Sequence, residues 1–178
     1  MGPAVYAEAA ESLGRELARR HIRLVTGAGR SGLMSAVNNG ANAEGGVTVG
    51  VIPRFMHERG WTYAPLSEVI VTENMHERKQ TMASLADAVI ALPGGSGTLE
   101  ELLEIITWRQ LGLYSGQVVI LNIDGFYDPL LRMFDRAVAD KFMTEQHRSI
   151  WQIAASPIEA VEMALIPVDI TSFAPKIN

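Results

Sequence analysis

Residues 93–101 read Pro93-Gly94-Gly95-Ser96-Gly97-Thr98-Leu99-Glu100-Glu101 and connect two different sequence patterns. The preceding segment 87–92 is apolar and rich in β-branched residues, which is typical of a buried strand, and the following segment 98–111 has helical spacing. Glycines in such a turn let backbone N–H groups face an anion, and the positive end of the helix dipole adds its field. The stretch therefore predicts a phosphate-binding turn, and the two glutamates beside it favour chemistry on a phosphorylated sugar.

The pattern of strand, turn and helix continues on both sides of this stretch. Apolar β-branched runs predict strands, and amphipathic spacing predicts helices between them. The predicted strands are 22–26, 47–53, 68–71, 87–92 and 117–122, and the predicted helices are 4–20, 32–44, 74–86, 98–111, 128–140 and 157–165. Residues 54–66 show no clear period and are predicted to form a loop. This alternation predicts an α/β fold, a doubly wound Rossmann-like parallel sheet with helices on both faces, as one nucleotide-binding domain over residues 1–178.

The composition of the chain argues against several classes of function. The chain has 178 residues, 48% of them hydrophobic, which suffices for one full core. Its net charge of −5 and lack of a basic run argue against nucleic-acid binding. No apolar run reaches the roughly 18–20 residues of a membrane span, and no signal peptide is visible, so we expect a cytoplasmic protein. There is no cysteine, and the four histidines lack metal-ligand spacing, so no metal or other cofactor is expected.

A second glycine-rich turn lies at Gly27-Ala28-Gly29-Arg30-Ser31-Gly32. It matches the pattern G-x-G-x-x-G between a predicted strand and a predicted helix, which is the context of a dinucleotide site. However, the next predicted strand ends at Pro53-Arg54, where an NAD site would need an acidic residue. Three interpretations stay open: a tight turn that packs a helix on the sheet, a nucleotide-contacting turn, and an NAD(P) site.

Two helix starts carry charged residues with competing interpretations. Asn74 and Glu77 have the spacing of a helix cap, whereas Arg78 and Lys79 fit either a solvated surface pair or a phosphate-binding pair. Similarly, Thr98 and Glu101 have the spacing of a capping box, although a cap alone needs no preceding run of glycines.

Residues 93–101, with Met75-His76-Glu77-Arg78-Lys79 upstream, closely resemble the Lonely Guy (LOG) family and its motif PGGxGTxxE. The resemblance extends from about residue 7 to about residue 165 and includes residues 32–34 and 107–112. Members of this family are often mislabelled as lysine decarboxylases. That activity needs a pyridoxal cofactor with a Schiff-base lysine, and none of the three lysines in this chain has such a context.

The resemblance implies hydrolysis of the N-glycosidic bond of nucleoside 5′-monophosphates, with cytokinin riboside 5′-monophosphates as substrates and AMP as an analogue. It implies Arg78 and Glu101 as catalytic residues. The implied substrate-binding residues are Met75, Lys79, Gly94, Gly95, Ser96, Gly97, Thr98, Glu100 and Thr107.

The resemblance also implies a homodimer, with a larger assembly possible, whose interface involves the helix bearing Trp108 and the following Leu111 and Leu113. The chain departs from the family at its start, because the family has a strand and a Gly/Ser turn before the first helix. We therefore expect that strand to be missing before residue 1. A substrate-contacting glutamate of the family has its nearest counterpart in Glu58.

Three other functions remain open from the sequence. One is a general nucleotide nucleosidase in salvage. Another is a non-catalytic carrier of a phosphorylated ligand such as molybdopterin. The third is an NAD(P) enzyme that uses the turn at residues 27–32.

Overall fold

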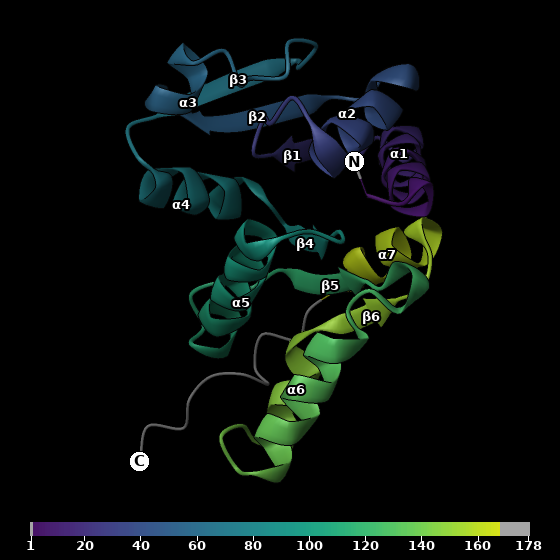
Figure 1. The fold of residues 1–178 in the computed structure, drawn as a ribbon, viewed down its shortest axis with the longest axis vertical. Helices are drawn as coiled ribbons and strands as arrows, with labels where there is room; N and C mark the ends of the chain where they lie inside the picture. The colour runs from purple at the N-terminus through teal and green to yellow at the C-terminus, as the bar shows by residue number, and fades with distance from the viewer. Residues whose placement is uncertain (1, 168–178) are drawn as a thin grey trace. The chain divides into compact units, whose positions relative to one another are not determined.

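The computed structural model describes residues 2–167 and divides the chain into two compact units, residues 1–86 and 87–178. Each unit contains a three-stranded parallel sheet flanked by helices (Figure 1). The predicted α/β class with parallel strands is confirmed. The prediction of one nucleotide-binding domain over 1–178 stays a prediction.

In the first unit the strands pair in the order β1-β2-β3. The central strand, β2, is buried along its whole length, as its run of Val and Ile predicts. The elements are α1 (Ala4–Arg19), β1 (Leu24–Thr26), α2 (Gly32–Ala43), β2 (Thr48–Pro53), α3 (Arg54–Glu58), β3 (Glu68–Thr72) and α4 (Met75–Leu85).

Helices α1 and α2 pack with their backbones in direct contact (Figure 1). A Cβ atom on Gly14 would lie 2.0 Å from the carbonyl oxygen of Val37, and one on Gly40 would lie 2.0 Å from that of Glu11. Both glycines are therefore required by the close approach of the two helices, which no side chain at these positions would permit.

In the second unit the strands pair in the order β4-β5-β6, and β5 is the buried central strand. The elements are β4 (Ala88–Ala91), α5 (Ser96–Gln110), β5 (Gln117–Leu121), the 3-10 turn η1 (Ile123–Gly125), α6 (Asp128–Ala139), the 3-10 helix η2 (Glu145–Ile150), β6 (Gln152–Ala154) and α7 (Pro157–Ala164).

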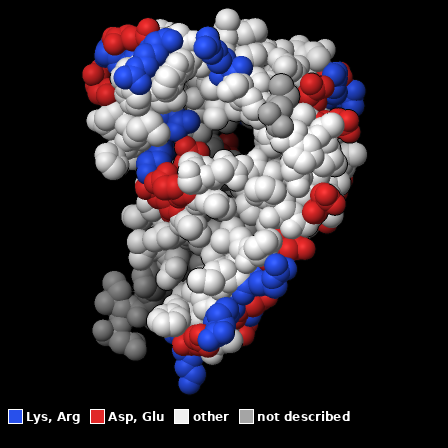
Figure 2. Space-filling model, viewed as in Figure 1, with Lys and Arg blue, Asp and Glu red and all other residues white. Residues whose placement is uncertain are grey.

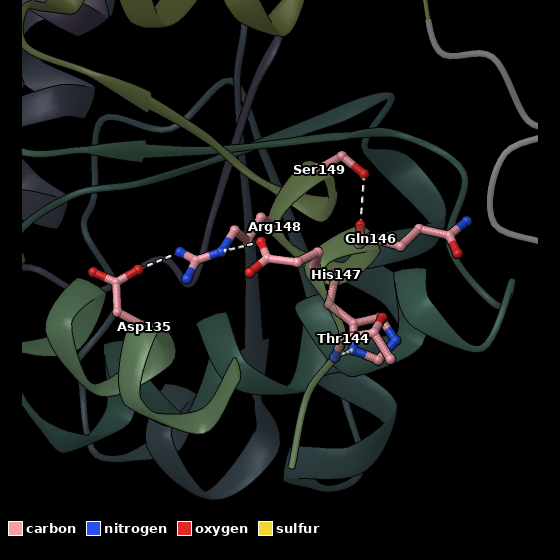
Figure 3. Close-up of polar contacts among 7 residues, drawn as sticks. Asp135, Thr144, Gln146, His147, Arg148 and Ser149 are labelled. Atoms are coloured by element: carbon pink, nitrogen blue, oxygen red, sulfur yellow. Dashed lines mark hydrogen bonds and ion pairs between the residues drawn. The ribbon is translucent and has the colours of Figure 1, made fainter. Parts of the chain in front are cut away.

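Polar contacts fix η2 beside α6 (Figure 3). Arg148 forms ion pairs with Asp135 of α6 and with Glu145, the latter at 2.8 Å. Thr144 and His147 cap the start of η2, because the backbone N–H of Thr144 donates to Nδ1 of His147 at 3.1 Å.

In Figure 2, basic and acidic side chains lie next to one another over α6. This alternation of charge identifies a solvated helix face.

Three predictions of local structure need correction. Residues 54–58 form the short helix α3 inside the predicted loop 54–66. The guanidinium of Arg59 lies over the rings of the exposed Phe55 and Trp61, and five residues are too few to show a helical period in the sequence. The three-residue strand β6 was missed because it is too short to show a pattern, and η2 was missed because its spacing is not that of an α-helix.

No helix in residues 2–167 is long and apolar enough to cross a membrane.

Candidate active site

The glycine loop of the second unit connects the end of β4 to the start of α5. The helix begins at Ser96 with Gly95 as its N-cap, and no side chain caps it. The first N–H groups of an α-helix have no partner within the helix, and they point outward along its axis. The loop therefore presents backbone donors and the positive helix end at the carboxyl end of a parallel strand, which is where α/β proteins bind ligands.

The glycines of this loop differ in what they contribute to the fold. A Cβ on Gly94 would lie 2.1 Å from Oγ1 of Thr98, so internal packing requires glycine there. A Cβ on Gly95 or Gly97 would meet no atom within 4 Å, and neither residue has positive φ. Gly97 lies in the first turn of α5, where glycine costs up to about 1 kcal/mol relative to alanine. The fold itself does not require glycine at positions 95 and 97. A ligand that approaches the backbone closely would require it.

Helix α5 carries the glutamates that follow the loop. Glu100 is exposed and Glu101 is half-buried. The predicted capping box is wrong, because Thr98 is the third residue of the helix and not its N-cap. Thr107 lies further along α5, where it is exposed and its hydroxyl donates to the carbonyl oxygen of Leu103 at 2.8 Å. The glutamates are thus not explained by the predicted cap.

A tyrosine that sequence patterns did not indicate, Tyr127, supports the loop through a hydrogen bond to the residue that precedes it. Tyr127 is 1% exposed, and its hydroxyl donates to the carbonyl oxygen of Leu92, the residue before Pro93. Its own N–H donates to Oδ1 of Asn122 at 2.7 Å. Burial raises the pKa of Tyr127 to about 12, so the hydroxyl stays a donor at neutral pH. Only a tertiary contact reveals this role, since Tyr127 lies 35 residues from Leu92.

The first unit carries its own predicted site residues at the start of α4. Asn74 caps this helix by accepting the N–H of Glu77 at 2.9 Å, and the carboxylate of Glu77 accepts the N–H of Glu73 at 2.8 Å. The predicted cap is therefore confirmed. Met75 is 38% exposed and Lys79 is half-buried.

Arg78 is buried, with 5% of its surface exposed, so its interpretation as a solvated surface residue is wrong. Its Nε donates to the carbonyl oxygen of Val51, in β2, at 3.1 Å. Its guanidinium also fills the space beside Gly27, where a Cβ would lie 1.7 Å from Nη2. Burying a guanidinium is costly unless it is well hydrogen-bonded, so this placement indicates a specific role.

The same contact explains the turn at residues 27–32. Gly27 is required by the guanidinium of Arg78, and Ala28 takes a left-handed conformation with φ of 59°. The turn is fixed to a neighbouring segment, because Arg30 N–H donates to the carbonyl oxygen of Trp61 at 3.1 Å and Tyr63 N–H donates to that of Ala28 at 2.8 Å. These contacts favour the tight-turn interpretation over an NAD(P) site.

The predicted site residues thus fall into two groups. Met75, Arg78 and Lys79 lie together at the start of α4 in the first unit. Gly94–Thr98, Glu100 and Glu101 lie together at the start of α5 in the second unit, and Thr107 lies further along that helix. Among residues 2–167 no group of His, Asp and Glu side chains is arranged to hold a metal ion.

Parallel sheets with flanking helices, together with a glycine loop before a helix that bears two glutamates, define an α/β protein of Rossmann-like architecture. Residues 34–164 match the family model described as possible lysine decarboxylase. The chain is 51% identical over 147 residues to the rice "Cytokinin riboside 5′-monophosphate phosphoribohydrolase LOG", covering 83% of this chain and 61% of that protein. It is 45% identical over 157 residues to the LOG5 enzyme of Arabidopsis thaliana, covering 88% of this chain and 69% of that protein. The chain belongs to the Lonely Guy (LOG) family, which confirms the resemblance in its sequence.

Solved structures agree on the fold. The molybdenum cofactor binding protein of Rippkaea orientalis superposes with a TM-score of 0.69 at 24% identity, covering 91% of this chain and 87% of that one. The molybdenum cofactor carrier protein of Chlamydomonas reinhardtii gives 0.66 at 23% identity, covering 90% and 86%. At this level of identity the likeness establishes the fold alone. The chain spans about three-fifths of the length of the rice relative.

Proposed function

We propose that this protein hydrolyses the N-glycosidic bond of nucleoside 5′-monophosphates and releases free base and ribose 5-phosphate. We propose cytokinin riboside 5′-monophosphates as its substrates, with AMP as an analogue. The observation that carries the proposal is the pair Gly95 and Gly97, which the fold does not require and which leaves the N-terminus of α5 open to a phosphate. Support comes from relatives at 45–51% identity that are named for this activity.

In this proposal the 5′-phosphate accepts hydrogen bonds from backbone N–H groups of Gly95, Ser96, Gly97 and Thr98. Gly94 allows the Thr98 side chain to close the inner side of the loop. Tyr127 holds the loop from behind through Leu92, so the donors are arranged before the substrate binds. Such preorganisation avoids an entropic cost on binding.

Glu101 acts on the ribose. Breaking the bond between C1′ and the base nitrogen develops positive oxocarbenium character at the sugar, which a nearby carboxylate stabilises. A water molecule adds to C1′ as the base leaves with the bond pair, and the proton lost by water is balanced by one gained by the base. Glu101 orients the ribose hydroxyls or accepts the proton from water. Glu100 and Thr107 contact the substrate from the same helix.

Arg78 fixes the substrate through its guanidinium and offsets negative charge on the phosphate or the departing base. The bond from its Nε to Val51 and its packing on Gly27 fix its orientation. Met75 and Lys79, from the same helix, contribute to binding.

We further propose that the protein is a cytoplasmic homodimer whose interface includes the end of α5. Leu111 and Leu113 are 56% and 70% exposed, although large apolar side chains favour burial. Trp108 of α5 is half-buried and lies three residues before Leu111 in the sequence.

The test is release of ribose 5-phosphate from AMP and from isopentenyl-AMP. Wild type is expected to release it, and Glu101→Gln is expected to bind both nucleotides without turnover. Glu104→Gln, one turn further along α5, is the matched control and should retain turnover. Turnover by a folded Glu101→Gln protein would contradict the mechanism, and tight binding without release by wild type would favour a carrier. The ratio of the two rates separates a cytokinin-activating enzyme from a salvage nucleosidase.

A further inference from the structure

The side chain of Met34 packs against the glycine turn of the first unit. Met34 is the third residue of α2, and its Sδ accepts the backbone N–H of Gly29 at 2.8 Å. A Cβ on Gly29 would lie 3.0 Å from this sulfur, and one on Gly27 would lie 3.3 Å from the Met34 methyl carbon. The thioether of Met34 therefore accepts a hydrogen bond from the turn and also fills the space beside Gly27 and Gly29.

Arg78 faces the same turn at Gly27. The site where a Gly27 Cβ would stand lies 1.7 Å from Nη2 of Arg78 and 3.3 Å from the Met34 methyl. The vacant Cβ position of Gly27 thus borders both side chains, so a movement of Met34 against the turn changes the surface on which the guanidinium rests. Because protein interiors are close-packed, such a displacement is transmitted and not absorbed.

We propose that Met34 is a site of reversible oxidation by peroxide, and that its sulfoxide displaces the turn from beneath Arg78. In this step a sulfur lone pair attacks one peroxide oxygen and the O–O bond breaks. The sulfur is oxidised by two electrons. The hydroxide that leaves takes the proton from the oxygen now bound to sulfur, which gives the sulfoxide and water. A thiol-dependent reductase restores the thioether.

Oxidation removes the present hydrogen bond whichever lone pair reacts. If the oxygen is added on the side of Gly29, it must fit where the nitrogen already lies 2.8 Å from the sulfur. If it is added on the other side, the sulfur acquires partial positive charge and faces the partial positive charge of the N–H. Either product is larger and more polar than the thioether, which favours a new conformation of the turn.

The chain offers a matched control. Met34 is half-buried, so peroxide can reach it, whereas Met133 on α6 is 65% exposed and belongs to the other unit. Met133 should be oxidised faster than Met34 and without functional effect. Met34→Leu retains an apolar side chain of similar volume and removes the oxidisable sulfur.

The experiment treats wild type, Met34→Leu and Met133→Leu with graded hydrogen peroxide. Peptide mass spectrometry gives the sulfoxide fraction at each methionine, and ribose 5-phosphate release from AMP gives the activity, each variant being compared with its own untreated sample. Wild type and Met133→Leu are expected to lose activity in proportion to the Met34 sulfoxide, by roughly tenfold to a hundredfold at full conversion. Met34→Leu is expected to lose less activity than wild type, its remaining loss following the sulfoxide fraction at the exposed Met75, and reductase treatment should restore the wild type. Equal losses in all three proteins, or full oxidation of Met34 without loss, would overturn the proposal.

The activity measurement rests on the proposed function, so a second readout is independent of it. The rate of amide hydrogen exchange at Gly29 in wild type should change when Met34 is oxidised, because the present hydrogen bond from Gly29 N–H to the thioether sulfur is replaced. If untreated protein does not hydrolyse AMP, the proposed function fails, and the exchange rate at Gly29 still decides the inference. Unchanged exchange in fully oxidised protein would refute it, even if Met34→Leu fails to fold.

Discussion

The hydroxyl of Tyr127 donates a hydrogen bond to the carbonyl oxygen of Leu92, and so connects the start of α6 to the residue that precedes the glycine loop. Tyr127 is 1% exposed, and its backbone N–H is held by Asn122. The loop that we propose to bind phosphate is thus supported by a buried contact 35 residues away in sequence.

We expect Tyr127→Phe to reduce both stability and activity while preserving the fold. The ring still fills its site, but the carbonyl group of Leu92 loses its donor, which costs about 1–2 kcal/mol of unfolding free energy. A looser loop should raise KM for the nucleotide more than it lowers kcat, since the loop binds the phosphate and Glu101 acts on the sugar. Chemical denaturation and steady-state kinetics measure the two effects. An unchanged KM in a destabilised protein would show that Tyr127 has only a structural role.

The same tyrosine predicts a loss of stability in strong alkali. Burial raises the pKa of Tyr127 to about 12 from the ordinary value of 10. Below pH 10 the phenol is protonated in both states, and its contribution to stability is fully present. Between pH 10 and 12 the unfolded chain ionises this group while the folded protein does not, so the unfolding free energy falls by up to about 2–3 kcal/mol.

Denaturation of wild type and Tyr127→Phe from pH 9 to 12 isolates this contribution. Burial also raises the pKa of Tyr114 to about 12, so both proteins should lose stability. The loss should be smaller in the variant. Parallel curves would mean that Tyr127 titrates at its ordinary pKa in the folded protein.

Sequence patterns predicted the long elements of this fold because their signals are local. The apolar runs at β2, β4 and β5 and the cap formed by Asn74 are determined by neighbouring residues, and the structure confirms them. The short helix α3 was not predictable in this way, since five residues are too few to show a helical period.

The candidate site was predictable in composition but not in the contacts that support it. Residues 93–101 indicated a phosphate-binding turn, whereas the support from Tyr127 arises only from tertiary packing. Arg78 shows the same limit: its sequence context allowed a surface position, and only the structure places its guanidinium against Gly27.

We expect Gly27→Ala to displace the guanidinium of Arg78. The new methyl group would lie 1.7 Å from Nη2, so the arginine must move, and activity should fall by at least tenfold if Arg78 acts on the substrate. Gly45→Ala is a control for glycine replacement in the same unit, because Gly45 has positive φ but no atom within 4 Å of the added Cβ. It should lose stability through backbone strain and keep its kcat. Full activity in Gly27→Ala would remove Arg78 from the mechanism.

Gly97→Ala separates the demands of the fold from those of the ligand. The added methyl meets no atom within 4 Å and alanine favours a helix, so the unfolding free energy should rise by about 0.5–1 kcal/mol. The same methyl lies on backbone that we propose to contact the phosphate, so KM for AMP should rise although the protein is more stable. Gln110→Ala, at the exposed far end of α5, is the control and should leave KM unchanged. A stabilised Gly97→Ala protein with wild-type KM would contradict phosphate binding at this loop, because the glycine would then serve neither packing nor ligand.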